Sequence, residues 1–284
     1  MSSSAKALGP FTGANAEAKE LLKNGRVLFS RGDYEQAAQA FSKAAALCPS
    51  AEARFEFARA LARKGEDDRA LAEFLESLSL DRNQPQARIE MAAILMKRLN
   101  YDEAGGQLRQ ALELRPDDLA TRGNYAICLQ NLGFFDLAIE QFKIILSKDP
   151  TSVEALYNLG VALRLKGKVD EAQDLFKKVI LHEPKPTDVQ LSLAHTELGK
   201  CLLLKKDVKS AVALERLAIK YMPSNHWAFL TLGEALNQQG KTDEALDAFR
   251  QAIQLKPKSP ECRKALSELL NKKLAQNKEN ILSR

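Results

Sequence analysis

The chain has 284 residues, of which 45% are hydrophobic and 28% are charged. A disordered protein would be less apolar than this, so the composition predicts a folded protein. Aromatic residues make up only 6%, and the abundance of alanine and leucine favours helices over β-structure.

The formal net charge is +5, and its distribution is uneven. From Lys256 onward the chain carries 8 Lys or Arg against 3 Asp or Glu, and the remainder is balanced. A nucleic-acid-binding protein usually has a basic stripe along its body, so nucleic acid is not an expected partner. We expect the excess of positive charge at the C-terminal end to keep a capping helix solvated. A docking site for an acidic partner is the alternative.

Cysteine and hydropathy patterns predict a reduced, cytoplasmic protein. The four cysteines form no C-x-x-C pair, so neither a zinc site nor a disulfide framework is indicated. The first thirteen residues contain no apolar signal core, and no later stretch approaches 18 uninterrupted apolar residues. Membrane insertion is therefore not expected.

In chain order, the first regularity is a column of alanines spaced 33 to 39 residues apart. It consists of Ala37, Ala70, Ala104, Ala138, Ala172, Ala211 and Ala245. Four residues after each alanine, and so on the same helical face, stands a large side chain in six of seven cases. This second column is Phe41, Phe74, Leu108, Phe142, Phe176, Glu215 and Phe249.

Two further columns precede each alanine. A leucine stands nine residues before it, and a glycine or alanine stands three residues before that leucine, from Gly25 with Leu28 to Gly233 with Leu236. A proline closes six of the seven units. Each unit thus predicts two short amphipathic helices that cross closely at small residues, the second helix being stopped by proline.

These residues resemble the tetratricopeptide repeat family. The 34-residue period, the small residue, the alanine and the proline match that family over residues 18–258. The resemblance implies an all-α fold, a right-handed solenoid of about seven helix–turn–helix units, with a capping helix at 259–276. Residues 1–17 and 277–284 are expected to be a flexible extension and a flexible tail.

The sixth unit is irregular. Five extra residues follow Pro184, and Thr187 with Gln190 has the form of a capping box, so the first helix of this unit is expected to start a turn early. Together with Glu215 in the aromatic column, this indicates a bend, a partner-specific projection or neutral drift.

No catalytic, metal or cofactor site is expected. The three histidines are few and scattered, His195 is expected at the start of a helix, and P-loop, G-x-G-x-x-G and H-E-x-x-H patterns are missing from the sequence. The pair Gly105-Gly106 lies in a helix and costs about 1 kcal/mol per glycine relative to alanine, which indicates a soft or closely packed spot. The chain is predicted not to be an enzyme.

The resemblance also implies that the first helices of the units line a concave groove that binds protein. The residues carried over onto this groove are Arg59, Arg63, Lys97, Asn124, Ile127, Gln130, Tyr157, Asn158, Val161, Arg164 and Lys200. Asn124 and Asn158 occupy one column of adjacent units and resemble an asparagine ladder that bonds a peptide backbone. Simple abundance of asparagine in this column is the alternative.

The matching positions do not form the clamp with which some relatives bind the C-terminus of heat-shock chaperones. In the first three units those positions hold Leu22, Arg26, Glu56, Gln86 and Glu90. Trp227 opens the last unit and is expected to pack against the preceding hairpin. The sequence therefore predicts an adaptor or scaffold that holds a peptide or helix of a partner protein. A chaperone-like assembly factor and a regulatory subunit of an enzyme complex are the alternatives.

Overall fold

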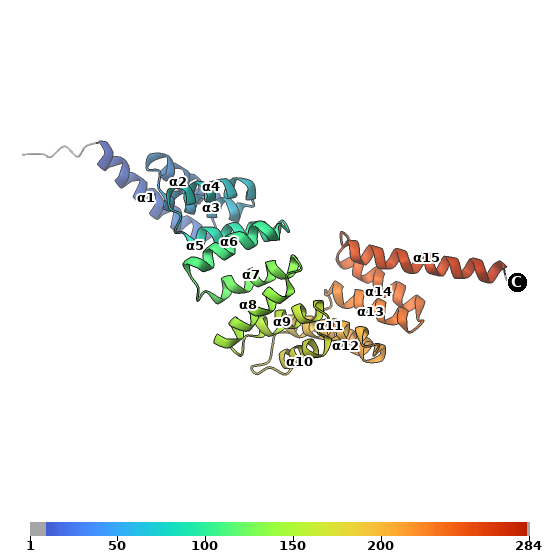
Figure 1. Ribbon diagram of the computed structural model, residues 1–284. Coiled ribbons are helices and arrows are strands. Elements are labelled where there is room, and N and C mark those ends of the chain that lie inside the picture. Colours follow the sequence, from blue (N-terminus) through green and yellow to red (C-terminus); the bar gives the residue numbers. More distant parts are fainter. Residues whose placement is uncertain (1–9, 283–284) are drawn as a thin grey trace, which may run out of the picture. The chain divides into compact units, whose positions relative to one another are not determined.

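The computed structural model describes the backbone of residues 10–282 and the side chains of residues 13–276 (Figure 1). Over this range all regular structure is helical and no strand occurs. The chain divides into two compact units, the first ending at Phe134 and the second beginning at Phe135. The expected all-α fold is confirmed.

The first unit holds seven helices. They are α1 (Pro10–Arg31), α2 (Tyr34–Leu47), α3 (Ala51–Lys64), α4 (Asp67–Leu80), α5 (Pro85–Lys97), α6 (Tyr101–Leu114) and α7 (Leu119–Asn131). The second unit holds α8 (Phe135–Lys148), α9 (Val153–Leu165), α10 (Val169–Ile180), α11 (Asp188–Leu204), α12 (Val208–Tyr221), α13 (His226–Gln238), α14 (Thr242–Leu255) and α15 (Pro260–Leu282). Within the two units the helices form six of the expected first-helix and second-helix pairs, namely α1–α2, α3–α4 and α5–α6 in the first unit and α9–α10, α11–α12 and α13–α14 in the second. Helices α7 and α8, the expected fourth pair, belong to different units, and α15 follows α14.

The repeated columns form the contacts within each pair. The side chains of all seven column alanines are fully buried. Where the small residue is glycine, the aromatic ring fills the space above it: a Cβ atom built on Gly25 or Gly233 would lie 2.5 or 2.4 Å from the ring of Phe41 or Phe249. Glycine therefore permits the close crossing that the sequence predicts.

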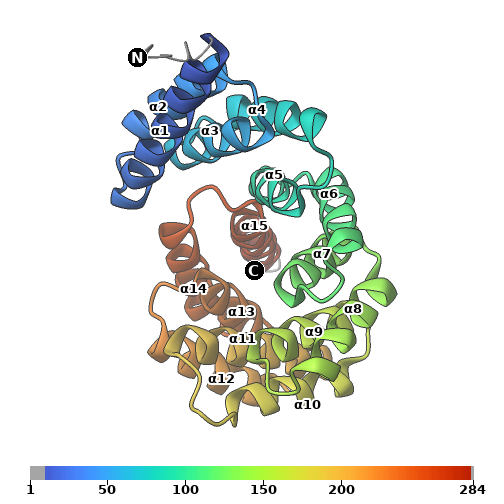
Figure 2. The same cartoon turned by 90° about the vertical axis from the view of Figure 1, so that its left-hand side faces the viewer.

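Within each unit the first helices line one side of the stack. Helix α1 contacts α3, and α3 contacts α5; in the second unit α9, α11, α13 and α15 contact one another in succession. Figure 2 shows α9, α11 and α13 on one side of the second unit and α10 and α12 on the other. Because the first helices are the more closely spaced, they form the inner face of each unit.

Ion pairs tie an inner-face helix, or the residue directly after it, to the first turn of the preceding second helix. Lys97 Nζ lies 2.9 Å from Asp67, Lys205 lies 2.6 Å from Asp170, and the same relationship joins Lys166 to Asp136 and Lys273 to Asp243. These exposed pairs add little stability individually. Because these pairs recur at equivalent positions, neighbouring hairpins stack in the same register.

The terminal helices differ in extent from the sequence prediction. Helix α1 begins at Pro10, inside the expected extension of residues 1–17, and α15 continues to Leu282, beyond the expected end at residue 276. Proline is well suited to the first helical position. The predicted flexibility of residues 1–9 and 283–284 lies outside the described residues.

The irregular start of the sixth unit is confirmed. Helix α11 has 17 residues, whereas α9 and α13 have 13. The Thr187 hydroxyl accepts from the Gln190 backbone N–H at 3.3 Å, and the Gln190 side chain accepts from the Thr187 backbone N–H at 2.9 Å. This reciprocal capping box starts the helix one turn early.

Candidate protein-binding surface

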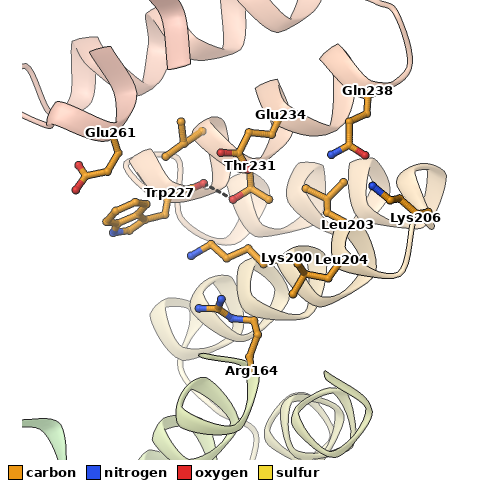
Figure 3. Close-up of a pocket in the computed structure, with 11 residues that line it drawn as sticks. Arg164, Lys200, Leu203, Leu204, Lys206, Trp227, Thr231, Glu234, Gln238 and Glu261 are labelled. Carbon is orange, nitrogen blue, oxygen red and sulfur yellow. Dashed lines mark hydrogen bonds between the residues drawn. The ribbon is translucent and has the colours of Figure 1, made fainter. Parts of the chain in front are cut away.

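The inner face of the second unit contains a pocket of about 520 Å³ (Figure 3). Its walls come from α9, α11, α13 and α15 and from the turn after α11. The lining residues are Arg164, Lys200, Leu203, Leu204, Lys206, Trp227, Leu230, Thr231, Glu234, Gln238 and Glu261. The pocket thus gathers side chains from four successive inner-face elements of one unit.

Part of this pocket is apolar. Leu203 and Leu230 are buried in the core of the second unit and expose only an edge to the pocket, while Leu204 is 58% exposed. The half-buried ring of Trp227 packs against the same core. An apolar floor with a partly exposed indole is the kind of surface on which a ligand side chain anchors.

Two lining residues, Arg164 and Lys200, are half-buried and share one buried carboxylate, that of Glu197. Arg164 Nε donates to Glu197 Oε2 at 2.7 Å, and Lys200 Nζ donates to Glu197 Oε1 at 2.7 Å. Arg164 reaches from α9 to α11, whereas Glu197 and Lys200 are one turn apart on α11. Both carboxylate oxygens are satisfied, so the two cations are held in fixed positions.

Lys200 also connects α11 to the indole of α13. Its ammonium lies 5.1 Å from the centre of the Trp227 ring, within the range of a cation–π contact. Trp227 packs against the preceding hairpin, as the sequence predicts. It also lines the pocket.

Lys206 lines the pocket, and its backbone adopts the left-handed conformation that residues with a Cβ atom rarely take. Its φ is 66°, whereas five other inter-helix turns place a glycine at positive φ, as at Gly167 with 87°. A non-glycine residue in this region is strained by about 1–3 kcal/mol. Strained residues of this kind cluster at functional sites, although Leu99 at φ 61° shows that the fold tolerates another.

The remaining inner-face residues predicted on α9 lie outside the pocket lining. Asn158 and Val161 are half-buried, and no hydrogen bond joins the Asn158 side chain to any described residue. The Tyr157 ring lies 5.9 Å from the Phe176 ring. Burial raises the pKa of Tyr157, as does the Glu197 charge, while Arg164 opposes the shift. Tyr157 therefore packs within the α9–α10 hairpin as well as lying on the inner face.

In the first unit, several predicted groove residues are engaged within the chain. Arg59 Nη1 donates to Glu56 at 2.9 Å, and its guanidinium lies 4.7 Å from the centre of the Phe29 ring. Lys97 pairs with Asp67, while Arg63 is exposed. These contacts organise the inner face of α1, α3 and α5 before any partner binds.

Helix α7 carries the other three predicted residues of the first unit. Asn124, Ile127 and Gln130 are all half-buried. The Gln130 Oε1 atom is buried and has no hydrogen-bond partner among the residues described. An unsatisfied buried acceptor costs about 1–3 kcal/mol. Because this oxygen is buried, a partner N–H group could reach it only after the Gln130 side chain moves.

Of the residues predicted to line the groove, Arg164 and Lys200 also line this pocket, whereas most of the other pocket residues are not among them. Leu203, Leu204, Lys206 and Glu261 were not identified. Lys206 could have been found from the sequence, because lysine stands there where most of the other turns between paired helices have glycine. Glu261 gave none, because its position depends on how α15 packs against α13 and α14.

The described residues contain no group of His, Cys, Asp and Glu arranged to hold a metal ion. No described helix meets the length and hydropathy needed to cross a bilayer. Burial raises the pKa of the Cys128 and Cys201 thiols to about 11, so both are protonated at neutral pH. All four cysteines are free.

Comparison with known families agrees with this architecture. Tetratricopeptide repeat profiles match residues 22–87, 126–189 and 226–259, which together are more than half of the chain. The chain belongs to the tetratricopeptide repeat family. Tetratricopeptide repeat proteins generally mediate protein–protein interaction, and this coarse function follows from membership.

Solved structures show the same fold. A tetratricopeptide repeat protein from Parabacteroides merdae is 15% identical, with a TM-score of 0.76 over 90% of this chain and 99% of its own. Yeast Tom70 is 22% identical, with a TM-score of 0.58 over 96% of this chain and 57% of its own. YrrB, described as a tetratricopeptide repeat protein with an unusual peptide-binding site, is 26% identical, with a TM-score of 0.57 over 69% of this chain and 98% of its own. No curated protein matches the chain in a sequence search.

Proposed function

We propose that the chain is a non-catalytic adaptor that holds a peptide segment or helix of a partner protein on the inner face of its repeats. In the second unit, the pocket beside Trp227 anchors an apolar side chain of that segment. The observation that carries this proposal is the convergence of α9, α11, α13 and α15 on one pocket with an indole in its wall. No cofactor takes part, and a cytoplasmic location remains a prediction.

The polar part of the pocket supports recognition of a peptide. Arg164 and Lys200 are both fixed by Glu197 and are only 16% and 24% exposed in their side chains. Charged groups that are already oriented lose little entropy on binding, so they favour one ligand geometry over others. Asn158, one turn earlier than Ala162 on α9, adds a free amide that can bond a peptide backbone.

The likeness to YrrB supports the same function. That protein is described as having a peptide-binding site, and it shares the fold over most of its own length. Shared fold alone does not fix where a ligand binds. The location at the Trp227 pocket therefore rests on this chain's own residues.

Site-specific photo-crosslinking tests the proposal in the full-length chain. A photoreactive benzophenone amino acid replaces Leu204, which is exposed at the edge of the pocket. The matched control places the same amino acid at Lys178, an exposed residue on the outer helix α10 of the same unit. Irradiation in an extract of the source cell, followed by mass spectrometry, identifies crosslinked peptides.

The proposal predicts a defined partner segment crosslinked from position 204 and not from position 178. One recurrent segment supports an adaptor. Many unrelated segments crosslinked from position 204 would favour the chaperone-like alternative. Crosslinks from position 178 alone would move the binding surface to the outer face and contradict the proposal.

A further inference from the structure

Glu215 occupies a repeat position at which the other units have a large apolar side chain. In the other six repeats this column holds five phenylalanines and Leu108. The Glu215 side chain is fully buried. The Glu215 side chain itself therefore does not project toward a partner.

The contact between Glu215 and Gly199 repeats the contact made by the phenylalanines. A Cβ atom built on Gly160 would lie 2.7 Å from the Phe176 ring, and one built on Gly199 would lie within van der Waals overlap of Glu215 Oε1. The carboxyl group thus lies in the crossing point between α11 and α12. At this point the other hairpins have only carbon atoms.

The carboxyl group has no adequate polar partner there. Neither oxygen of Glu215 makes a hydrogen bond of normal geometry with a described residue. Burying an unpaired charge is strongly unfavourable, and such a group is instead kept in its uncharged form. Burial accordingly raises the pKa of Glu215 well above its ordinary value.

Charged and polar groups around Glu215 come from the two helices packed on α12. From α11, Lys200 and Thr196 favour the charged form, whereas Glu197 disfavours it; from α13, Glu234 also disfavours it. Lys200 is already bonded to Glu197 at 2.7 Å. The surroundings therefore do not supply a free countercharge for an ionised Glu215.

We propose that the α11–α12 hairpin contains a pH-sensitive joint, which is closed while the Glu215 carboxyl is uncharged and opens when that carboxyl ionises. Opening moves the charged group from the Gly199 crossing toward water. The event is an acid dissociation: the proton leaves to solvent and the carboxylate remains on α12. No other reactant is needed.

The joint lies directly behind the pocket. Lys200, Leu203 and Leu204 reach the pocket from α11, and Trp227 reaches it from α13, against which α12 also packs. Loosening of α12 removes the support of these side chains. A rise in pH above the ordinary pKa of a glutamate would then weaken the surface on which the proposed adaptor function rests. The joint itself can be tested without any partner.

Hydrogen exchange tests the joint in the full-length chain. Opening constants for α11 and α12 peptides are measured from pH 5 to pH 9 and corrected for the intrinsic exchange rate. The variant Glu215→Gln keeps the size of the side chain and cannot ionise. The wild-type opening constant, divided by that of the variant, is expected to rise by up to about tenfold per pH unit between the ordinary and the raised pKa of Glu215.

Two further variants keep the test decisive. Glu215→Leu places in α12 the residue found at the same column position in α6, and it serves as the reference if the glutamine variant does not fold. Glu140→Gln removes an exposed glutamate of α8 and should leave the pH dependence of wild type intact. A ratio that is constant with pH for both Glu215 variants would overturn the proposal while leaving the adaptor function untouched.

Discussion

The aromatic ring of Phe176 lies so close to Gly160 that a Cβ atom on this glycine would be 2.7 Å from Cε1 of the ring. Real Cβ atoms essentially never approach another carbon so closely. Both residues are buried, so neither helix of the α9–α10 hairpin can relieve the overlap without moving the other.

Gly160→Ala should therefore destabilise the second unit, although alanine is the better helix former. Overpacking of this kind costs about 1–3 kcal/mol, which exceeds the gain of about 1 kcal/mol from helix propensity. Gly106→Ala is the matched control, because no atom lies within 4 Å of a Cβ built on that helical glycine. Chemical denaturation should show a lower unfolding free energy for the first variant and an equal or higher one for the second.

The column alanines give a second prediction. Ala172 lies at the α9–α10 crossing and is fully buried. Ala172→Phe should lower the unfolding free energy by about 1–3 kcal/mol or more, because a ring cannot fit between the helices. Circular dichroism during heating measures this; an unchanged melting temperature would show that Ala172 is not a packing residue. Ala138→Phe should behave alike.

His195 predicts a loss of stability in acid. Burial lowers its pKa below the ordinary value, while its hydrogen bond to the Leu191 carbonyl, at 2.7 Å, opposes this. Below about pH 6.5 the unfolded chain binds a proton that the folded chain resists, so stability falls as the pH falls. His195→Phe keeps an aromatic ring beside Tyr221, 5.5 Å away in the wild type, and cannot titrate.

The unfolding free energy of the wild type should therefore decrease relative to this variant as the pH falls below about 6.5, by up to about 1.4 kcal/mol per pH unit. Urea denaturation at several pH values measures the difference. Parallel pH profiles for the two proteins would show that His195 is freely protonated in the folded state.

For Lys206, the effect of its backbone strain on stability can be measured separately from the effect of its side chain on binding. Replacing it with glycine relieves the left-handed backbone at φ 66°, an effect that offsets the greater flexibility of glycine in the unfolded chain. Lys206→Gly should melt no earlier than wild type and bind the partner segment more weakly. Full affinity in this variant would mean that the Lys206 side chain does not contact the ligand.

Asn158 tests the predicted backbone contact on α9. Its side chain makes no hydrogen bond to the described chain, so Asn158→Ala should leave stability unchanged and weaken peptide binding by about 1–3 kcal/mol. Tyr157→Ala is a poor companion variant, because the ring packs on Phe176 and its loss would destabilise α9–α10. Tyr157→Ala would therefore change stability and binding together.

The repeat columns made the fold predictable because they are local: the alanine, the large residue four positions later and the small residue twelve positions earlier all belong to one hairpin. The surface was harder to predict, because its contacts join different hairpins. The stacking of Arg59 on Phe29 crosses from α3 to α1. The hydrogen bond from Arg164 to Glu197 spans 33 residues, and no residue pattern within either repeat predicts it.

The central claim is that a partner peptide binds beside Trp227, and calorimetric titration of the crosslinked segment against Trp227→Ala tests it most directly. Circular dichroism first confirms that the variant is folded at the assay temperature. Loss of an anchoring aromatic costs about 2 kcal/mol or more, so the dissociation constant should rise by at least roughly thirtyfold, while Lys178→Ala binds like wild type. Wild-type affinity in Trp227→Ala, with weakened binding in Lys178→Ala, would contradict the account.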